Sequence, residues 1–295
     1  MKSPMIALLG LLAMALTSNS NELQVVSFHR LQTNERFDLS GILKLDASLR
    51  SRYQAAGDYL VINDKTAVIY DAKLTGSEVT VRPLLDLKSL GVKGEFDLEG
   101  IDRSGPNLYI VNEAQGNIII LSGPEPKDVR TLGPRIPWST LFPAYALSSK
   151  FGLEGLAISD GRIFLAKEMA PLAIFELKED QSTKIYPSHR LGSQTDLKFV
   201  KDQLYVLDRE GRCIWKTKIP LITQETCLSF SSAMKHPELD YWTKDSRKKQ
   251  QPHWGTAEAL EVFEDQFIIG FDNNGQSLKS REDSRPVIAV MKLKK

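Results

Sequence analysis

Two closely similar strings decide the fold of this chain: FDLEGI at residues 96–101 and FGLEGL at residues 151–156. Looser copies of the pattern occur three more times, and each copy precedes a turn and an apolar run. The five segments are Asp38-Leu39-Ser40-Gly41-Ile42, Asp97-Leu98-Glu99-Gly100-Ile101, Gly152-Leu153-Glu154-Gly155-Leu156, Gln194-Thr195-Asp196-Leu197-Lys198 and Thr256-Ala257-Glu258-Ala259-Leu260. A repeat of this kind predicts an array of similar structural units.

Each unit continues with further apolar runs that are rich in β-branched and aromatic residues and bounded by turn residues, as expected of β-strands. A fourth, more polar strand is expected in the first four units, at Val79–Leu84, Val129–Leu132, Ser182–Leu191 and Thr226–Phe230. The units start about 42 to 62 residues apart, a spacing typical of four-stranded propeller blades. The sequence therefore predicts an all-β fold, a five-bladed β-propeller.

The last unit lacks a fourth strand, and the segment Leu23–Leu31 precedes the first unit without a partner. We expect this segment to supply the missing outer strand, because that pairing closes the ring and covers an exposed edge. A six-bladed ring is the alternative, if the insertion Ser231–Trp254 conceals a degenerate blade.

The first 20 residues are typical of a signal peptide: Lys2 precedes an apolar run from Met5 to Leu16, and polar residues follow. We therefore expect a signal peptide at 1–20, a single propeller domain at 21–295, a secreted or periplasmic location, and no integral membrane segment after removal of the signal. An uncleaved N-terminal anchor is the alternative. Cys213 and Cys227 flank a proline-containing turn, so they form either a disulfide that suits an oxidising compartment or two buried thiols.

The chain carries 38 basic and 37 acidic side chains and a formal charge of +1. Such a balance creates no global field that would draw the protein onto nucleic acid or an anionic membrane. We expect a monomer whose charge-driven chemistry is local.

The blade-start acids are the candidate local site. Equivalent start positions of the innermost strands point at the axis of a propeller, and crowded carboxylates there either raise their pKa values or hold a cation. Oxygen ligands of this charge favour Ca²⁺ over Zn²⁺. The predicted calcium-site residues are Ser40, Glu99, Glu154, Asp196 and Glu258. The alternative is that each acid hydrogen-bonds the backbone of the next blade as a structural latch.

The second strand of each unit returns to the same face and ends in another polar set, for which ordinary turn chemistry is the simpler explanation. This set is Asn63-Asp64, Asn112-Glu113, Lys167-Glu168, Asp208-Arg209 and Asp272-Asn273. The long insertions Gly133–Lys150 and Ser231–Trp254 are expected to rise over this face. We expect this face to bind a small polar or anionic ligand at the channel mouth.

Two functions from different classes follow. The first is a calcium-dependent hydrolase of phosphate esters or anhydrides, with Glu113 or Glu168 as the base and Arg209 as the phosphate clamp. The second is a non-catalytic ligand- or protein-binding propeller with a structural central cation.

The strings at 96–101 and 151–157, each leading to a strand that ends in Asn-Glu or Lys-Glu, resemble the esterase-like phytase and SdiA-regulated propeller families. This resemblance implies an exported propeller that is often calcium-associated. The order of blade-start residues, with Asp196-Leu197-Lys198-Phe199 leading to the run 204–209, is more weakly similar to five-bladed calcium-activated nucleotidases (apyrases). That resemblance implies calcium at the five blade-start positions.

Overall fold

The computed structural model describes residues 21–33, 35–122, 128–132, 152–168, 172–178, 183–188, 192–219, 225–241, 253–254 and 256–294. The expected signal peptide at 1–20 and the insertion at 133–150 lie outside these residues. Within them nearly all regular structure is β-strand, which confirms the all-β prediction.

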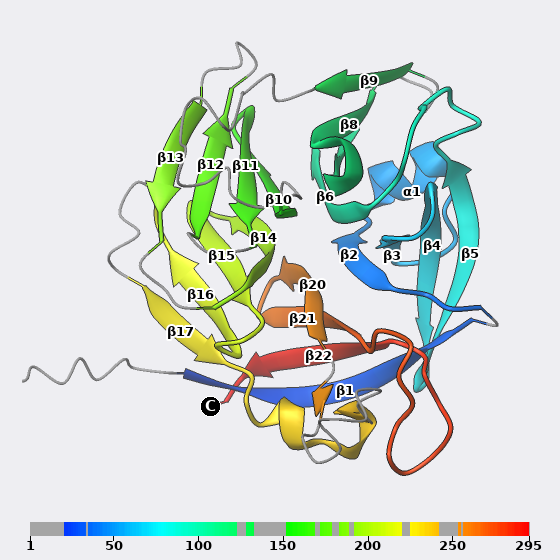
Figure 1. Cartoon of the computed structure of the whole chain (residues 1–295), viewed down its shortest axis with the longest axis vertical. Coiled ribbons are helices and arrows are strands. Elements are labelled where there is room, and N and C mark those ends of the chain that lie inside the picture. Colours follow the sequence, from blue (N-terminus) through cyan, green and yellow to red (C-terminus); the bar gives the residue numbers. More distant parts are fainter. Residues whose placement is uncertain are drawn as a thin grey trace, which may run out of the picture.

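The strands form antiparallel meanders of four (Figure 1). The first comprises β2 (Leu39–Lys44), β3 (Tyr59–Asn63), β4 (Val68–Thr75) and β5 (Glu78–Asp86); the second β6 (Leu98–Ser104), β7 (Asn107–Asn112), β8 (Asn117–Ser122) and β9 (Asp128–Leu132). Next come β10 (Leu153–Ser159), β11 (Arg162–Lys167), β12 (Ala173–Leu177) and β13 (Thr183–Pro187), then β14 (Gln194–Val200), β15 (Gln203–Asp208), β16 (Cys213–Thr217) and β17 (Thr226–Ser229). Finally β20 (Thr256–Phe263), β21 (Gln266–Asp272) and β22 (Val287–Leu293) are completed by β1 (Asn21–Gln32).

The first strand of each meander lies nearest the middle of the molecule (Figure 1). We call β2, β6, β10, β14 and β20 the inner strands. Each contacts the inner strands of the two neighbouring meanders, in the cyclic order β2, β6, β10, β14, β20 and back to β2. The strands therefore surround a common axis.

Glycines allow the inner strands to approach one another closely. A Cβ at Gly155 would lie 2.6 Å from Asp196 Cα, and one at Gly100 would lie 2.8 Å from Glu154 O. Real Cβ atoms cannot come this close to backbone atoms, so a side chain at either position would push the strands apart. The glycine after each glutamate in the strings at 96–101 and 151–156 is explained by this contact.

Strand β1 closes the fold, as the sequence predicts. It pairs antiparallel with β22 over Leu23–Arg30, and the two strands lie side by side in Figure 1. Its ends also make short parallel ladders with β17 and β5. Leu23 and Leu31 are fully buried, so this strand contributes to the core as well as covering an edge.

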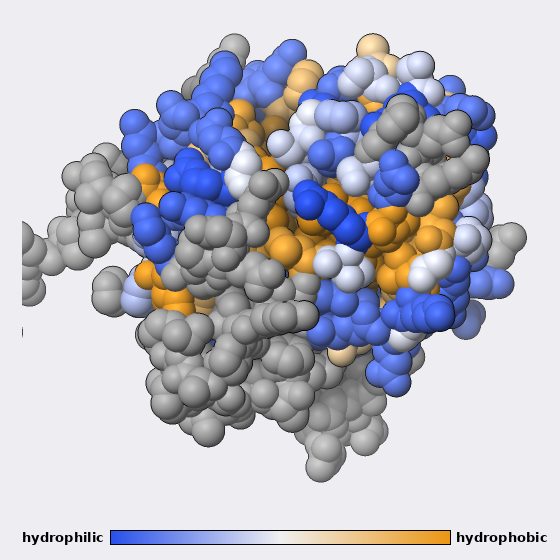
Figure 2. Space-filling model, turned by 90° about the horizontal axis from the view of Figure 1, so that it is seen from above, coloured by the Kyte–Doolittle hydropathy of each residue, from blue (hydrophilic) through white to orange (hydrophobic). Residues whose placement is uncertain are grey.

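The apolar core lies between neighbouring meanders. One cluster joins Tyr109 and Val111 of β7 to Leu156 of β10 and Phe175 of β12. Because alternate residues of each strand face opposite sides, each sheet can pack on both of its neighbours. Seen edge-on in Figure 2, hydrophilic residues cover much of the described surface, and apolar residues gather in a band between them.

A short helix, α1 (Ala47–Tyr53), connects β2 to β3 where the sequence analysis expected a turn. The Asp46 carboxylate caps it by accepting from Leu49 N at 2.9 Å, and Leu49 and Tyr53 are buried. The turn expectation was wrong here because two turns of helix are too short to give a sustained helical period. No helix of the described residues has the length and apolar composition needed to cross a bilayer.

Cys213 and Cys227 form a disulfide between β16 and β17, with 5.4 Å between their Cα atoms. They lie diagonally, since Cys227 pairs with Trp215 in the ladder. Of the insertion after β17, the described part holds two 3-10 turns, Ala233–Lys235 and Pro237–Leu239, and the two-residue strands β18 (Asp240–Tyr241) and β19 (His253–Trp254).

A candidate metal centre at the strand starts

The inner strands share a β-bulge near their first residue. The ladder to the second strand is interrupted in all five, between Leu39/Gly41, Leu98/Gly100, Leu153/Leu156, Gln194/Asp196 and Ala257/Ala259. One residue is left out in four of them, and two, Glu154 and Gly155, are left out in β10. A bulge leaves a residue unpaired and re-aims its side chain. Ser40, Glu99, Glu154 and Glu258 lie at these bulges and line one cleft of about 140 Å³. The structure therefore brings four of the five predicted calcium-site residues together.

We call this cleft, lined also by Asp38, Leu39, Asp64, Arg209, Asp272 and Asn274, the acidic cleft. The second strands run antiparallel to the inner strands, so their last residues return to the same end of the molecule, as predicted. Asp272 is the last residue of β21, and Asp64 and Arg209 directly follow the last residues of β3 and β15. A repeated backbone contact holds the return in place: Glu113 N donates to Asp97 O at 2.8 Å, and Glu168 N to Gly152 O at 2.8 Å.

Asp196 does not belong to the acidic cleft. In β14 the bulge residue is Thr195, and Asp196 takes the ladder position that Gly100 holds in β6. The alignment that equated Asp196 with Glu99 is therefore wrong by one residue. The Asp196 side chain is fully buried and accepts from Leu197 N and Leu260 N, both at 2.7 Å.

The two hydroxyl-bearing bulge residues connect neighbouring inner strands. Ser40 Oγ donates to Leu98 O on β6, and Thr195 Oγ1 donates to Ala257 O on β20 at 2.7 Å. Each hydroxyl is thus used in a contact between strands. Carboxylates remain the main candidate cation ligands at the bulges.

Two sets of carboxylates are close enough to share a cation. Asp64, Asp97 and Glu99 form one set, and Glu99, Glu113 and Glu154 form the other; within each set the ligand atoms lie within 4.8 Å of one another. Glu99 belongs to both sets. Glu113 is 6% exposed, and its Oε1 accepts from Gly152 N at 3.0 Å, which orients the carboxylate.

The protein itself neutralises only part of this charge. Burial and the neighbouring Glu154 carboxylate raise the pKa of Glu99, and burial and Glu168 raise the pKa of Glu154. Burial and Asp38 raise the pKa of Asp272 to about 7. Asp272 Oδ1 is buried and has no hydrogen-bond partner among the described residues. A bound cation would stabilise the ionised form of each of these carboxylates.

Arg209 is an internal counter-ion of the cleft. Its guanidinium pairs with Glu168, pairs with Glu258 at 2.5 Å, and donates to Ser193 Oγ at 3.0 Å. Burial alone would lower the pKa of Arg209, but the Glu258 and Glu168 carboxylates outweigh that effect and raise it. The predicted phosphate clamp is therefore already engaged, and that role stays a prediction, as do the base roles of Glu113 and Glu168.

The sequence analysis did not single out Asp38, Asp97 or Lys65. Asp38 and Asp97 open two of the repeat strings, so a signal was present. Lys65 follows Asp64 and pairs with it, and its Nζ lies 3.5 Å from Asp97 Oδ1. That contact joins two meanders and could not be read from the chain.

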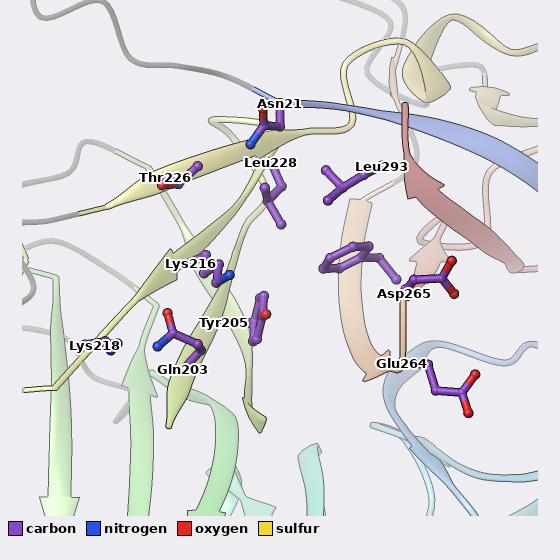
Figure 3. Close-up of a pocket in the computed structure, with 11 residues that line it drawn as sticks. Asn21, Gln203, Tyr205, Lys216, Lys218, Thr226, Leu228, Glu264, Asp265 and Leu293 are labelled. Carbon is purple, nitrogen blue, oxygen red and sulfur yellow. The ribbon is translucent and has the colours of Figure 1, made fainter. Parts of the chain in front are cut away.

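A larger groove of about 570 Å³ lies elsewhere, between β15–β17 and the turn and strands β21–β22 (Figure 3). In Figure 3, Gln203, Tyr205 and Lys216 line one wall, and Asp265 and Leu293 line the other. None of the acidic-cleft residues lines this groove. Its mixed charge gives it a different character from the cleft.

Comparisons with known proteins identify the fold and no family. No protein family and no curated protein matches the sequence. Among solved structures, glutaminyl cyclase from Myxococcus xanthus aligns over 94% of this chain and 99% of its own, with 10% identity and a TM-score of 0.57. A putative gluconolactonase aligns over 91% of this chain and 93% of its own, with 8% identity and a TM-score of 0.50.

Both neighbours are β-propellers, and at such low identity the likeness shows the fold alone. The resemblances to esterase-like phytases, SdiA-regulated propellers and apyrases therefore stay hypotheses. The chain has the β-propeller fold, and its acidic carboxylate clusters have the spacing to hold a metal ion.

Proposed function

We propose that this protein is a five-bladed propeller that binds a calcium-type cation in the acidic cleft. The main support for this proposal is the set Glu99, Glu113 and Glu154, whose ligand oxygens lie within 4.8 Å of one another. The orphaned Asp272 oxygen in the same cleft is the second support. The cyclic contacts of the five inner strands and the pairing of β1 with β22 support the proposed count of five blades.

The ligand types favour Ca²⁺. Every ionisable acceptor that lines the cleft is a carboxylate, and no histidine or cysteine is among its lining residues, all of which the structure describes. Hard oxygen ligands suit Ca²⁺, which accepts six to eight of them in flexible geometry, whereas Zn²⁺ prefers nitrogen and sulfur. Waters and a small polar or anionic ligand would complete the coordination at the mouth.

The cation stabilises the ring in this proposal. Glu99 and Glu154 belong to different blades, so one ion bound by both would join β6 to β10. Arg209 favours this non-catalytic role, because both of its terminal nitrogens are occupied by carboxylates. The disulfide is consistent with an extracytoplasmic location, and we propose that the monomer acts outside the cytoplasm after signal removal.

Hydrolysis of phosphate esters or anhydrides is the second candidate. Ca²⁺ would polarise a phosphoryl oxygen, and Glu168, 17% exposed beside the cleft, would act as the base. This function requires Arg209 to leave its two carboxylates. Phosphate release from nucleotides, phytate and simple esters, with Ca²⁺ and with chelator, tests it; calcium-dependent release that Glu168→Gln abolishes would replace the structural role with catalysis.

Calcium titration followed by thermal unfolding tests the cation site. A ligand at a hundredfold excess over its Kd adds about 2.7 kcal/mol to the free energy of unfolding. We expect the parent to show this stabilisation and Glu154→Gln to lose most of it. Glu264→Gln, in the turn before β21, is the matched control and should keep it. Equal calcium stabilisation of the parent and Glu154→Gln would exclude the site.

A further inference from the structure

A second cavity, of about 430 Å³, lies at the opposite ends of the inner strands from the acidic cleft. Its lining includes Lys44 and Phe263, the last residues of β2 and β20, and Val200, the last residue of β14. All of its lining residues are described. The volume falls within the range of small-molecule pockets, and the site is independent of the proposed cation site.

The cavity has an apolar wall. Ile158 and Val262 are buried, at 8% and 5% exposure, whereas Phe263 is 40% exposed. Apolar side chains that line a concave surface are typical of small-molecule pockets. These residues would contact the apolar body of a ligand.

Lys198, one of the polar lining residues, is 3% exposed, and its Nζ donates to Ile101 O at 2.6 Å. Ile101 belongs to β6, so the side chain reaches from β14 past β10. An ammonium carries three N–H donors. Among the described residues, Ile101 O is the hydrogen-bond acceptor for Lys198 Nζ. Lys198 thus has N–H donors that make no hydrogen bond to the described residues, although Asp102, Asp196 and Glu261 lie near enough to stabilise its charge.

The acids near the cavity are already occupied. Glu261 Oε2 accepts from Lys44 N at 2.7 Å, and its Oε1 accepts from Val262 N at 2.9 Å. Asp102 Oδ2 accepts from Ile158 N at 2.7 Å. These carboxylates are held by backbone donors and leave little capacity to bind a cationic ligand.

The cations at the mouth differ in their pairing. Arg103 pairs with Asp46 at 2.6 Å, and Arg50 pairs with Asp58 at 3.3 Å. Lys44 Nζ instead lies over the ring of Phe263, 4.8 Å from its centroid, and pairs with no carboxylate of the described residues. The charge at the mouth that has no carboxylate partner among the described residues is therefore the positive charge of Lys44, which lies against the apolar Phe263 ring.

We propose that this cavity binds a small amphipathic organic acid, whose apolar body lies against Ile158, Val262 and Phe263 and whose acid group pairs with Lys44. A ligand hydroxyl or carbonyl oxygen accepts from Lys198. The acidic cleft and this cavity thus form two separate sites at opposite ends of the inner strands.

Fluorescence titration of the full chain with anilinonaphthalene sulfonate, an aromatic acid, tests the proposal. We expect saturable binding that Lys44→Met and Phe263→Ala each weaken about tenfold, the loss expected for a charge-assisted contact or a buried aromatic face. Lys218→Met, in the groove of Figure 3, is the matched control and should bind like the parent. Thermal unfolding of each variant must match the parent, because partly folded chains that expose apolar surface also bind this dye.

Competition with octanoate and octanol separates an acid site from a merely apolar one. Octanoate should displace the dye from the parent about tenfold better than octanol, and Lys44→Met should remove that difference. Equal displacement by the two compounds, or loss of binding in Lys218→Met with Lys44→Met unaffected, would overturn the proposal. The titration is repeated with Ca²⁺ and with chelator. Dye binding in chelator tests the cavity independently, even if the acidic cleft binds no cation.

Discussion

At one end of the inner strands Glu99 and Glu154 lie against other carboxylates, whereas at the other end Asp102, Asp196 and Glu261 surround Lys198. Both groups of acids stand on inner strands, and both consist of aspartate and glutamate side chains. What differs is the hydrogen bonding, because the three acids near Lys198 each accept from a backbone N–H of the next inner strand. We call Lys198 with these three acids the Lys198 cluster.

These backbone contacts make the cluster a set of latches between blades. Asp102 on β6 holds Ile158 of β10, Asp196 on β14 holds Leu260 of β20, and Glu261 on β20 holds Lys44 of β2. A carboxylate with such donors is partly stabilised within the fold, although burial still raises its pKa, whereas one that faces other carboxylates is also destabilised by their charge. Asp196 thus makes the contact that the latch alternative of the sequence analysis describes, whereas the carboxylate sets of Glu99 have the spacing to hold a metal ion.

Removing the positive charge from each region should produce the largest contrast. Lys198→Met leaves three buried carboxylates without their counter-ion, and we expect it to cost about 3 to 5 kcal/mol in the free energy of unfolding, with or without Ca²⁺. Arg209→Met should cost less and recover in Ca²⁺, because the cation replaces the guanidinium beside Glu258 and Glu168.

Urea unfolding in chelator and in Ca²⁺ measures both variants. Lys73→Met, on the exposed face of β4, is the control for a lost surface charge. If calcium restored Lys198→Met as well as Arg209→Met, the two regions would not be distinct.

The pH dependence should separate the regions next. The pKa values of Glu99, Glu154 and Asp272 are raised by burial and by neighbouring carboxylates, so the folded state binds more protons than the unfolded chain. Stability without metal should therefore fall as pH rises from about 4 to about 7, by on the order of 2 kcal/mol. Burial also raises the pKa of Asp196 to about 7, against the effect of Lys198, so the cluster contributes a fall of the same sign.

Calcium should remove only the part of this pH-dependent loss of stability that comes from the acidic cleft, because a cation there would bind the ionised carboxylates. Urea unfolding at several pH values, with chelator and with saturating Ca²⁺, should give two curves that separate as pH rises. Parallel curves would show that the ion does not bind these acids.

Replacing one acid in each region by its neutral amide should give the smallest changes in the free energy of unfolding, with opposite signs in the two regions. Glu99→Gln removes a repelling charge from the cleft, and we expect it to stabilise the cation-free protein by about 1 kcal/mol. Asp102→Asn weakens the bond from Ile158 N and removes a counter-charge of Lys198, so it should destabilise by about 1 kcal/mol. Chemical denaturation in chelator measures both, and a shared sign would contradict the comparison.

Much of the fold could be predicted from local pattern. The repeat strings, the polar fourth strands and the unpaired segment before the first unit are all periodic signals, and β1 does pair with β22. The bulge acids Glu99 and Glu154 were also predictable, because the glycine after each marks the point where a neighbouring strand approaches. Such signals are visible because one backbone geometry recurs in every blade.

The register of β14 could not be predicted in the same way. Thr195 and Asp196 are both polar and adjacent, so an alignment by residue type chose the acid, whereas the ladder places the threonine at the bulge. A shift of one residue turns a side chain to the other face of a strand, which is why Asp196 faces Leu260 N and not the cleft.

The sequence by itself determined the repeat, the strand content, the closing strand and the end of the propeller where acids gather, since these depend on periodicity along the chain. Only the tertiary structure decided which acids face one another and which meet a backbone N–H, that Arg209 joins Glu168 to Glu258, and that Lys198 reaches Ile101 across the axis. Those contacts join residues of different blades. They depend on how the blades are arranged around the axis, which no local pattern records.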